Sequence, residues 1–260
     1  MTSESISVCG GSVSLLRMGK GEPLLVLPRD NGRAPDTKFL DLVAEHFTVY
    51  APQLPGFHGS TETDWKWLSN VRDLAVVVGQ MAGALGHARI NLLGLGFGGW
   101  VAAELATMSP ALVQRLMLVS PMGIQPKNGY ICDQFVISTE SYARTAFADQ
   151  AAFDAIYTAE PGFEQLDAWE TDREMASRLA WKPYMYNATL PRLLAGVSTP
   201  SLIVWGDADR VVPFECAALY KAALPQATLE TMPGVGHAVD LEQPAALAAT
   251  IAAFCKNAGA

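Results

Sequence analysis

One segment of the sequence strongly restricts the fold: an apolar strand that runs through a glycine-rich turn into a helix. Residues 90–95 are mostly apolar, glycine fills four of the six positions from Gly94 to Gly99, and an alanine-rich stretch continues to Met108. Glycines at such a turn let strand and helix approach closely, and they tolerate a strained backbone at its central residue. The segment predicts a strand–turn–helix unit of an α/β protein.

Short apolar runs alternate with helix-like patterns along most of the chain, which predicts a mostly parallel central sheet flanked by helices. Ligands of such sheets gather beyond the carboxyl ends of the strands. The predicted strands are Ser12–Arg17, Leu24–Leu27, Phe47–Ala51, Ile90–Leu95, Leu116–Val119, Ser201–Trp205 and Thr228–Met232, and the predicted helices are Thr37–Glu45, Val71–Leu85, Phe97–Met108, Glu215–Ala223 and Pro244–Cys255.

The alternation stops between residues 121 and 195, where aromatic residues are frequent and no core strand is evident. A structureless loop of this length is improbable in a compact domain, and its aromatic side chains need packing partners. We therefore expect a helical cap over residues 121–195, inserted into a core made of residues 1–120 and 196–260.

Composition excludes several classes of protein. Hydrophobic residues make up 50% of the chain and charged ones 17%, which argues against disorder. The net charge of −8 disfavours nucleic acid and anionic membranes as partners. Residues 1–10 lack the pattern of a targeting signal, so we expect a cytoplasmic protein. The four cysteines form no Cys-x-x-Cys pair, and we expect neither a metal nor another cofactor.

Three further motifs give the glycine-rich turn a context. Residues 201–213 read as a strand followed by a loop with Asp209, and residues 232–244 place His237 in a loop before the last helix. Together with residues 54–60, these motifs resemble the α/β-hydrolase family over nearly the whole chain outside the cap. The chain order of turn, acid and histidine is that of the family.

The resemblance implies that Asp209 is the catalytic acid, that His237 is the catalytic histidine, and that Gly96 stands where the nucleophile is expected. Asp207 is a competing candidate for the acid, since it lies only two residues from Asp209. The alternative for Asp209 and His237 is a helix-capping aspartate and an ordinary loop histidine.

Two departures from the family pattern bear on the chemistry. Glycine has no side chain that can attack a substrate, so a covalent acyl-enzyme cannot form at Gly96. The resemblance also implies that the backbone N–H groups of Asp30 and Phe97 form the oxyanion hole. A carboxylate at Asp30 would repel an oxyanion, unless Arg29 pairs with it, its side chain turns away or it holds a proton.

A His–Asp pair without serine is still a general base. Asp209 would fix the tautomer of His237, whose other ring nitrogen would then take a proton from water or substrate. The missing serine side chain predicts a space above Gly96 comparable with one bound water. Ser120 and Asp30 are the two candidates for a replacement nucleophile, although turn and loop roles are the commoner explanation for both.

Aromatic and charged residues indicate the substrate. The residues predicted to bind it are Arg29, Trp100, Ser120, Trp181, Lys182 and Tyr184, and together they suggest a mostly apolar pocket with a few polar anchors. A medium-sized aromatic or alicyclic carbonyl compound would suit such a pocket. The alternative is that the aromatic residues only pack and that Lys182 points to solvent.

The leading functional hypothesis is an enzyme that hydrolyses an ester, thioester, lactone or carbon–carbon bond of a small carbonyl compound with water activated by His237. A lyase, isomerase or cofactor-free oxygenase that starts with proton abstraction would use the same base. Two hypotheses without turnover are a protein that binds a small ligand unchanged, and a serine hydrolase disabled by replacement of its serine. The sequence leaves the oligomeric state open.

Overall fold

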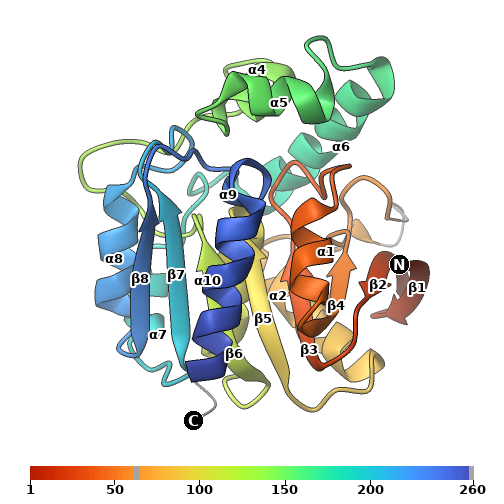
Figure 1. Cartoon of the computed structure of the whole chain (residues 1–260), viewed down its shortest axis with the longest axis vertical. Helices are drawn as coiled ribbons and strands as arrows, with labels where there is room; N and C mark the ends of the chain where they lie inside the picture. Colours follow the sequence, from red (N-terminus) through yellow and green to blue (C-terminus); the bar gives the residue numbers. More distant parts are fainter. Residues whose placement is uncertain (61–64, 258–260) are drawn as a thin grey trace.

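A computed structural model describes residues 1–60 and 65–257, and its centre is an eight-stranded sheet (Figure 1). The strand order is β1-β2-β4-β3-β5-β6-β7-β8. The strands from β4 to β8 in this order are parallel, whereas β1 and β2 pair in antiparallel fashion with their neighbours. The strands are β1 (Thr2–Val8), β2 (Gly11–Met18), β3 (Glu22–Leu27), β4 (Phe47–Pro52), β5 (Ile90–Leu95), β6 (Val113–Val119), β7 (Ser201–Gly206) and β8 (Ala227–Met232).

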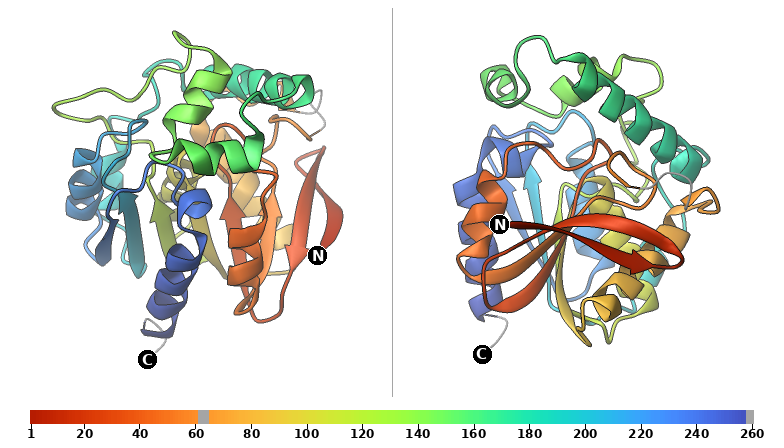
Figure 2. Two further views of the ribbon diagram at one scale, coloured as in Figure 1. Left: turned by 45° about the horizontal axis from the view of Figure 1, so that its top comes forward. Right: turned by 90° about the vertical axis from the view of Figure 1, so that its right-hand side faces the viewer.

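Helices cover both faces of this sheet (Figure 2). On one side lie α1 (Lys38–Ala44), α9 (Val239–Glu242) and α10 (Pro244–Asn257), and on the other lie α2 (Val71–Ala84), α3 (Phe97–Met108) and α8 (Glu215–Ala223). Successive strand residues alternate between two apolar clusters: Leu25 and Leu27 of β3 enter one, and Leu24 and Val26 enter the other. Burial on both faces explains why the parallel strands are continuous apolar runs.

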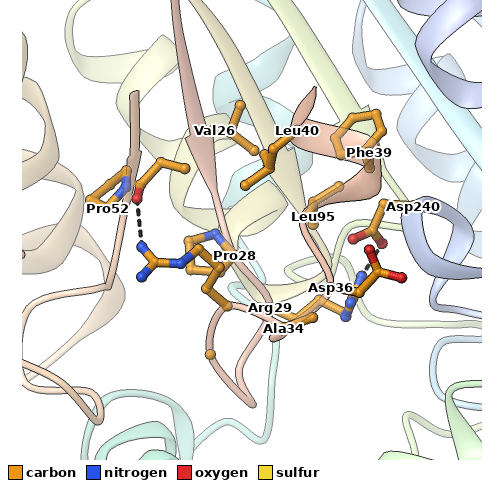
Figure 3. A pocket seen from close by; sticks show the side chains of 13 residues that line it. Val26, Pro28, Arg29, Ala34, Asp36, Phe39, Leu40, Pro52, Leu95 and Asp240 are labelled. Atoms are coloured by element: carbon orange, nitrogen blue, oxygen red, sulfur yellow. Dashed lines mark hydrogen bonds and ion pairs between the residues drawn. The ribbon is translucent and has the colours of Figure 1, made fainter. Parts of the chain in front are cut away.

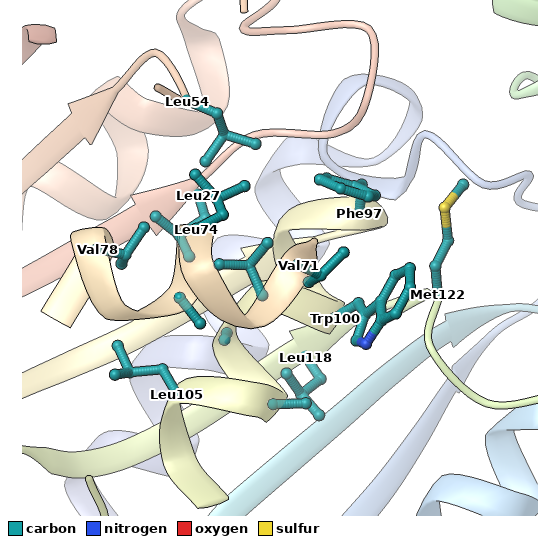
Figure 4. Close-up of a cluster of buried hydrophobic side chains, with 14 of the residues drawn as sticks. Leu27, Leu54, Val71, Leu74, Val78, Phe97, Trp100, Leu105, Leu118 and Met122 are labelled. Atoms are coloured by element: carbon teal, nitrogen blue, oxygen red, sulfur yellow. The ribbon is translucent and has the colours of Figure 1, made fainter. Parts of the chain in front are cut away.

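The larger cluster joins α2 and α3 to the sheet (Figure 4). Leu74 and Val78 of α2 and Leu105 of α3 belong to this cluster, as do Phe97 and Trp100 at the start of α3 (Figure 4). The first turn of α3 is therefore held in the hydrophobic core, directly below the carboxyl edge of the sheet.

Four helices lie between β6 and β7 in the chain: α4 (Thr139–Thr145), α5 (Gln150–Tyr157), α6 (Phe163–Ala180) and α7 (Leu190–Leu194). The first three lie above the carboxyl ends of the parallel strands (Figures 1 and 2). α7 instead packs against α3 and α8, beside the sheet. The boundaries of the cap at residues 121 and 195 stay a prediction.

The predicted fold class is confirmed, and the seven predicted strands and five predicted helices all form. β1 and α9 were not predicted. β1 has a polar, serine-rich sequence because it is an edge strand with mostly exposed side chains. It is joined to β2 by Cys9 and Gly10, which both have positive φ, as a tight hairpin turn requires.

No helix within residues 1–60 and 65–257 is both long enough and apolar enough to cross a membrane.

An atom added at the contact between α3 and the end of β3 should destabilise the protein. A Cβ atom on Gly98 would lie 2.4 Å from the carbonyl oxygen of Pro28. We expect Gly98→Ala to lower the free energy of unfolding by about 1–3 kcal/mol, since backbone must shift to accommodate it. Gly83→Ala in α2, where nothing lies within 4 Å, should instead stabilise the protein by up to about 1 kcal/mol. Denaturant unfolding measures both values, and equal stability of the two variants would contradict this account.

Candidate active site

The sharp turn between β5 and α3 is built around Gly96, which has φ 51° and ψ −112°. Its neighbours allow the strand and the helix to meet: a Cβ atom on Gly94 would lie 2.3 Å from the carbonyl oxygen of Gly98. The N–H of Gly98 donates to the carbonyl oxygen of Pro28 at 3.0 Å. These contacts bring the loop after β3, which carries Arg29 and Asp30, alongside the turn.

Side chains from elsewhere fill the place of the missing side chain at Gly96. A Cβ atom there would lie 2.7 Å from Nε2 of His237 and 2.9 Å from Cγ of Arg29. Real Cβ contacts are not so short, so a side chain on residue 96 would require the His237 ring or the Arg29 side chain to shift. Two long side chains border the predicted water-sized space above Gly96, which stays a prediction.

Asp209 and His237 lie together at the carboxyl edge of the sheet. Oδ2 of Asp209 is 2.8 Å from Nδ1 of His237 and accepts a hydrogen bond from the indole N–H of Trp205 at 3.1 Å. The N–H groups of Val211 and Val212 donate to Oδ1 at 2.8 and 2.9 Å. Four contacts thus fix this carboxylate, and a carboxylate beside Nδ1 favours the tautomer with its proton on that nitrogen.

Asp207, the competing candidate, is turned away from the histidine. Its Oδ1 accepts a hydrogen bond from the N–H of Gly234 at 2.6 Å. This contact ties the loop after β7 to the turn after β8, which is a structural role.

Several polar atoms beside the turn lack hydrogen-bond partners in the described part of the chain. Nε2 of His237 and Oγ of Ser120 are both buried and unpartnered. Ser120 has φ 45° and lies at the end of β6, where its N–H donates to the carbonyl oxygen of Val204. Buried polar groups nearly always have partners, so such atoms at one sheet edge indicate a place for a polar ligand.

The Asp30 carboxylate is buried and turned towards the cap. Its Oδ2 accepts hydrogen bonds from the hydroxyl of Tyr142 at 2.6 Å and from Nε2 of Gln134 at 3.3 Å. Burial raises the pKa of Asp30, although the Tyr142 hydrogen bond and the charges of His237 and Arg29 oppose that shift.

The backbone N–H of Phe97 belongs to the first turn of α3, where amide groups lack partners within the helix. It can therefore donate to a ligand above the turn. The roles of Asp30 and Phe97 as oxyanion donors stay predictions.

Arg29 is buried and forms an ion pair with Asp240, from the short helix α9. Burial alone would lower the pKa of Arg29, but the Asp240 carboxylate outweighs it and the pKa is raised. The pair borders a small pocket on the α1 side of the sheet, with apolar walls that include Phe39, Leu40 and Leu95 (Figure 3). Arg29 therefore stands between this pocket and Gly96.

The aromatic residues predicted to bind substrate occupy different environments. Trp100 is buried, and its indole N–H donates to Glu104 at 3.1 Å. The hydroxyl of Tyr184 accepts from the N–H of Gln134 and donates to the carbonyl oxygen of Cys132.

Trp181 is 55% exposed, and with Lys182 it lines a surface pocket beside α6 whose lining does not include His237. The substrate-binding roles of all these residues remain predictions.

Several residues of the site were not found from the sequence. Tyr142 and Gln134 lie in the cap, outside every motif, so nothing in the sequence pointed to their contact with Asp30. Asp240 carried a weak signal, because it lies three residues after His237 in a loop already expected at the same sheet edge.

A second buried carboxylate, Asp172 of α6, contacts the loops after β3 and β4. Its Oδ1 accepts a hydrogen bond from the N–H of His58 at 2.6 Å, and its Oδ2 lies against Gly32. Burial raises the pKa of Asp172 to about 7, opposed by the His58 hydrogen bond and increased by the negative charge of Asp30. The cap is thus joined to the core by two buried carboxyl groups.

No group of three or more His, Cys, Asp or Glu side chains among the described residues is arranged to hold a metal ion.

The sheet, the turn at Gly96 and the His–Asp pair have the arrangement of an α/β-hydrolase-type protein. Residues 31–250 match the sequence profile of the Alpha/beta hydrolase family, and the chain belongs to that family.

Relatives of similar length carry hydrolase names. The chain is 22% identical over 233 residues to "Uncharacterized hydrolase YugF" of Bacillus subtilis, with 84% of each chain covered. It is 27% identical over 236 residues to the pimeloyl-[acyl-carrier protein] methyl ester esterase of Yersinia enterocolitica, covering 84% of this chain and 86% of the esterase. The crystal structure of a bacterial membrane phospholipase A has the same fold, with a TM-score of 0.86 and 23% identity over 99% of this chain and 86% of its own.

Asp172 should give the stability of the protein a specific pH dependence. Between about pH 4 and pH 7 the folded protein retains a proton on Asp172 that the unfolded chain has released, so the free energy of unfolding falls as pH rises through this range. Asp172→Asn does not titrate and keeps an oxygen for the N–H of His58. We expect the stability of the wild type, relative to this variant, to decrease from pH 4 to pH 7.

Urea unfolding at several pH values measures this difference. Asp167→Asn, an exposed aspartate on the same helix, is the matched control and should show no comparable trend. If the free energy of unfolding of the wild type, relative to Asp172→Asn, stays constant or increases with pH, the raised pKa of Asp172 is contradicted.

Proposed function

We propose that this protein is an enzyme that hydrolyses an ester or a similar small carbonyl compound with a His–Asp general base and without a covalent serine. The observation that carries this proposal is the environment of His237, whose Nδ1 contacts Asp209 while the buried Nε2 has no partner in the described residues. A ring held in this way has one free basic nitrogen, directed away from its carboxylate.

In the proposed reaction, Nε2 of His237 takes a proton from water as the water oxygen bonds to the carbonyl carbon. The negative charge collects on the carbonyl oxygen, and Asp209 stabilises the imidazolium ion. The tetrahedral intermediate then collapses, the bond to the leaving group breaks, and His237 returns the proton to that group. An ester gives an acid and an alcohol, with all atoms balanced.

The family and the names of relatives support this substrate class. One relative is named a methyl ester esterase and another a hydrolase. We assign residues 121–195 to a cap that covers the substrate, and we assign a mostly apolar or aromatic substrate to the interface of cap and core. Trp100, Ser120, Trp181, Lys182 and Tyr184 are the proposed contacts.

The unpartnered Nε2 of His237 also supports a second candidate, in which this nitrogen takes a proton from the substrate itself. Such a lyase, isomerase or cofactor-free oxygenase needs no attacking water beside the ring. Turnover in H₂¹⁸O separates the two candidates, because only hydrolysis transfers the oxygen of water to the acid product.

His237→Gln should lower kcat for 4-nitrophenyl acetate and butyrate by about 10²–10⁴-fold, because the base is lost. His87→Gln is the matched control, since that ring contacts Tyr50 away from the turn. Steady-state kinetics on folded protein, verified by circular dichroism, measures the effect. Equal activity of His237→Gln and wild type would refute the proposal.

Gly96→Ser tests whether the chain is a disabled serine hydrolase. A Cβ atom here would lie 2.7 Å from Nε2 of His237, and φ of 51° disfavours any side chain. We expect the variant to be less stable and to show no burst of 4-nitrophenol, and Gly96→Ala should be destabilised equally. A stoichiometric burst from the serine variant alone would favour the disabled enzyme.

A further inference from the structure

Three of the buried polar side-chain atoms without partners belong to residues that meet around Gly96. They are Nε of Arg29, Oγ of Ser120 and Nε2 of His237. The other such atoms in the described residues belong to Trp65, Glu104, Arg115 and Trp169, outside the catalytic motifs. A buried polar group without a partner is destabilising, and a cluster of such donors and acceptors indicates a site that water or a polar ligand occupies.

The side chain of Arg29 and the ring of His237 approach the same point above Gly96. Cδ of Arg29 lies 3.5 Å from the Cβ position of Gly96, and Nε2 of His237 lies 2.7 Å from the same point. Because Nε is bonded to Cδ, it lies at most about 5 Å from that point. A ligand atom beside the ring of His237 is thus within reach of Arg29.

Asp240 fixes the guanidinium without using all of its donors. Its carboxylate binds Nη1 of Arg29 and leaves Nε–H free. The other nearby carboxylate, Asp30, accepts its hydrogen bonds from Tyr142 and Gln134 of the cap. A buried cation with a free N–H therefore remains beside the catalytic base.

We propose that Nε–H of Arg29 binds the oxygen of the substrate that becomes negatively charged, and that it binds the carboxylate of the acid product in the same way. This inference rests on the proposed function. A charged donor in a dry site stabilises an oxyanion strongly, and arginine stays protonated throughout the reaction. The positive charge of Arg29 offsets the negative charge that the Asp30 carboxylate introduces beside the proposed oxyanion donors. Asp240 is a positioning residue that holds the guanidinium.

Butyrate, the carboxylate product of a butyrate ester, is a probe that needs no turnover. Arg29→Gln should weaken butyrate binding about tenfold or more, equivalent to roughly 1.4 kcal/mol, as measured by calorimetry. It should also lower kcat for 4-nitrophenyl butyrate more than it raises KM. Arg33→Gln is the matched control, because Arg33 lines the same pocket but donates to the carbonyl oxygen of Ala51.

Removing Arg29 alone leaves Asp240 buried and unpaired, which can prevent folding. The double variant Arg29→Gln/Asp240→Asn removes both charges and should show the same loss of butyrate affinity. Asp240→Asn alone, which keeps the cation, should retain most of the affinity and lose kcat. Unchanged butyrate affinity in the folded double variant would overturn the inference.

His237→Gln separates this inference from the proposed function. If His237→Gln keeps full activity while Arg29→Gln binds butyrate more weakly, His237 is not the general base and the anion site at Arg29 is supported. If His237→Gln is inactive while both Arg29 variants bind butyrate with unchanged affinity, the role of His237 is supported and Arg29 does not bind the anion.

Discussion

The rest of the site depends on the close contact between the first turn of α3 and the end of β3. The N–H of Gly98 donates to the carbonyl oxygen of Pro28, at a separation that no side chain on Gly98 would permit. This contact sets the start of the following loop, so that Arg29 reaches Gly96 and Asp30 reaches the cap. One backbone hydrogen bond between a glycine-rich helix start and the end of β3 thus helps to place the charged groups around His237.

The sequence was most informative where local chemistry determines structure. The parallel strands are apolar because both faces of the sheet are covered, and the turn at Gly96 needs glycine at a positive φ. β1 lacked such a pattern, because an edge strand buries few side chains and owes its position to pairing with β2. α9 is a single turn, too short for a helical period to be visible.

The site divides in the same way between local and distant contacts. Asp209 and His237 lie in loops with recognisable motifs, and the structure brings them together. The contacts of Asp30 with Tyr142 and of Arg29 with Asp240 join residues more than a hundred positions apart, so no local pattern encodes them. The crowding at Gly96 was also hidden, since it arises from the reach of His237 and Arg29 and not from the turn itself.

The hydrogen bond from Tyr142 to Asp30 couples the position of the cap to the protonation of the core. Asp30 is dehydrated in this closed arrangement, and dehydration favours its neutral form. Withdrawal of α4 would admit water to that carboxyl group, lower its proton affinity and release a proton where one is bound. By thermodynamic linkage, acidity then favours the closed state and alkalinity the open one. A helix above the sheet and a carboxyl group in the loop after β3, 112 positions apart in the sequence, are thus coupled through one proton.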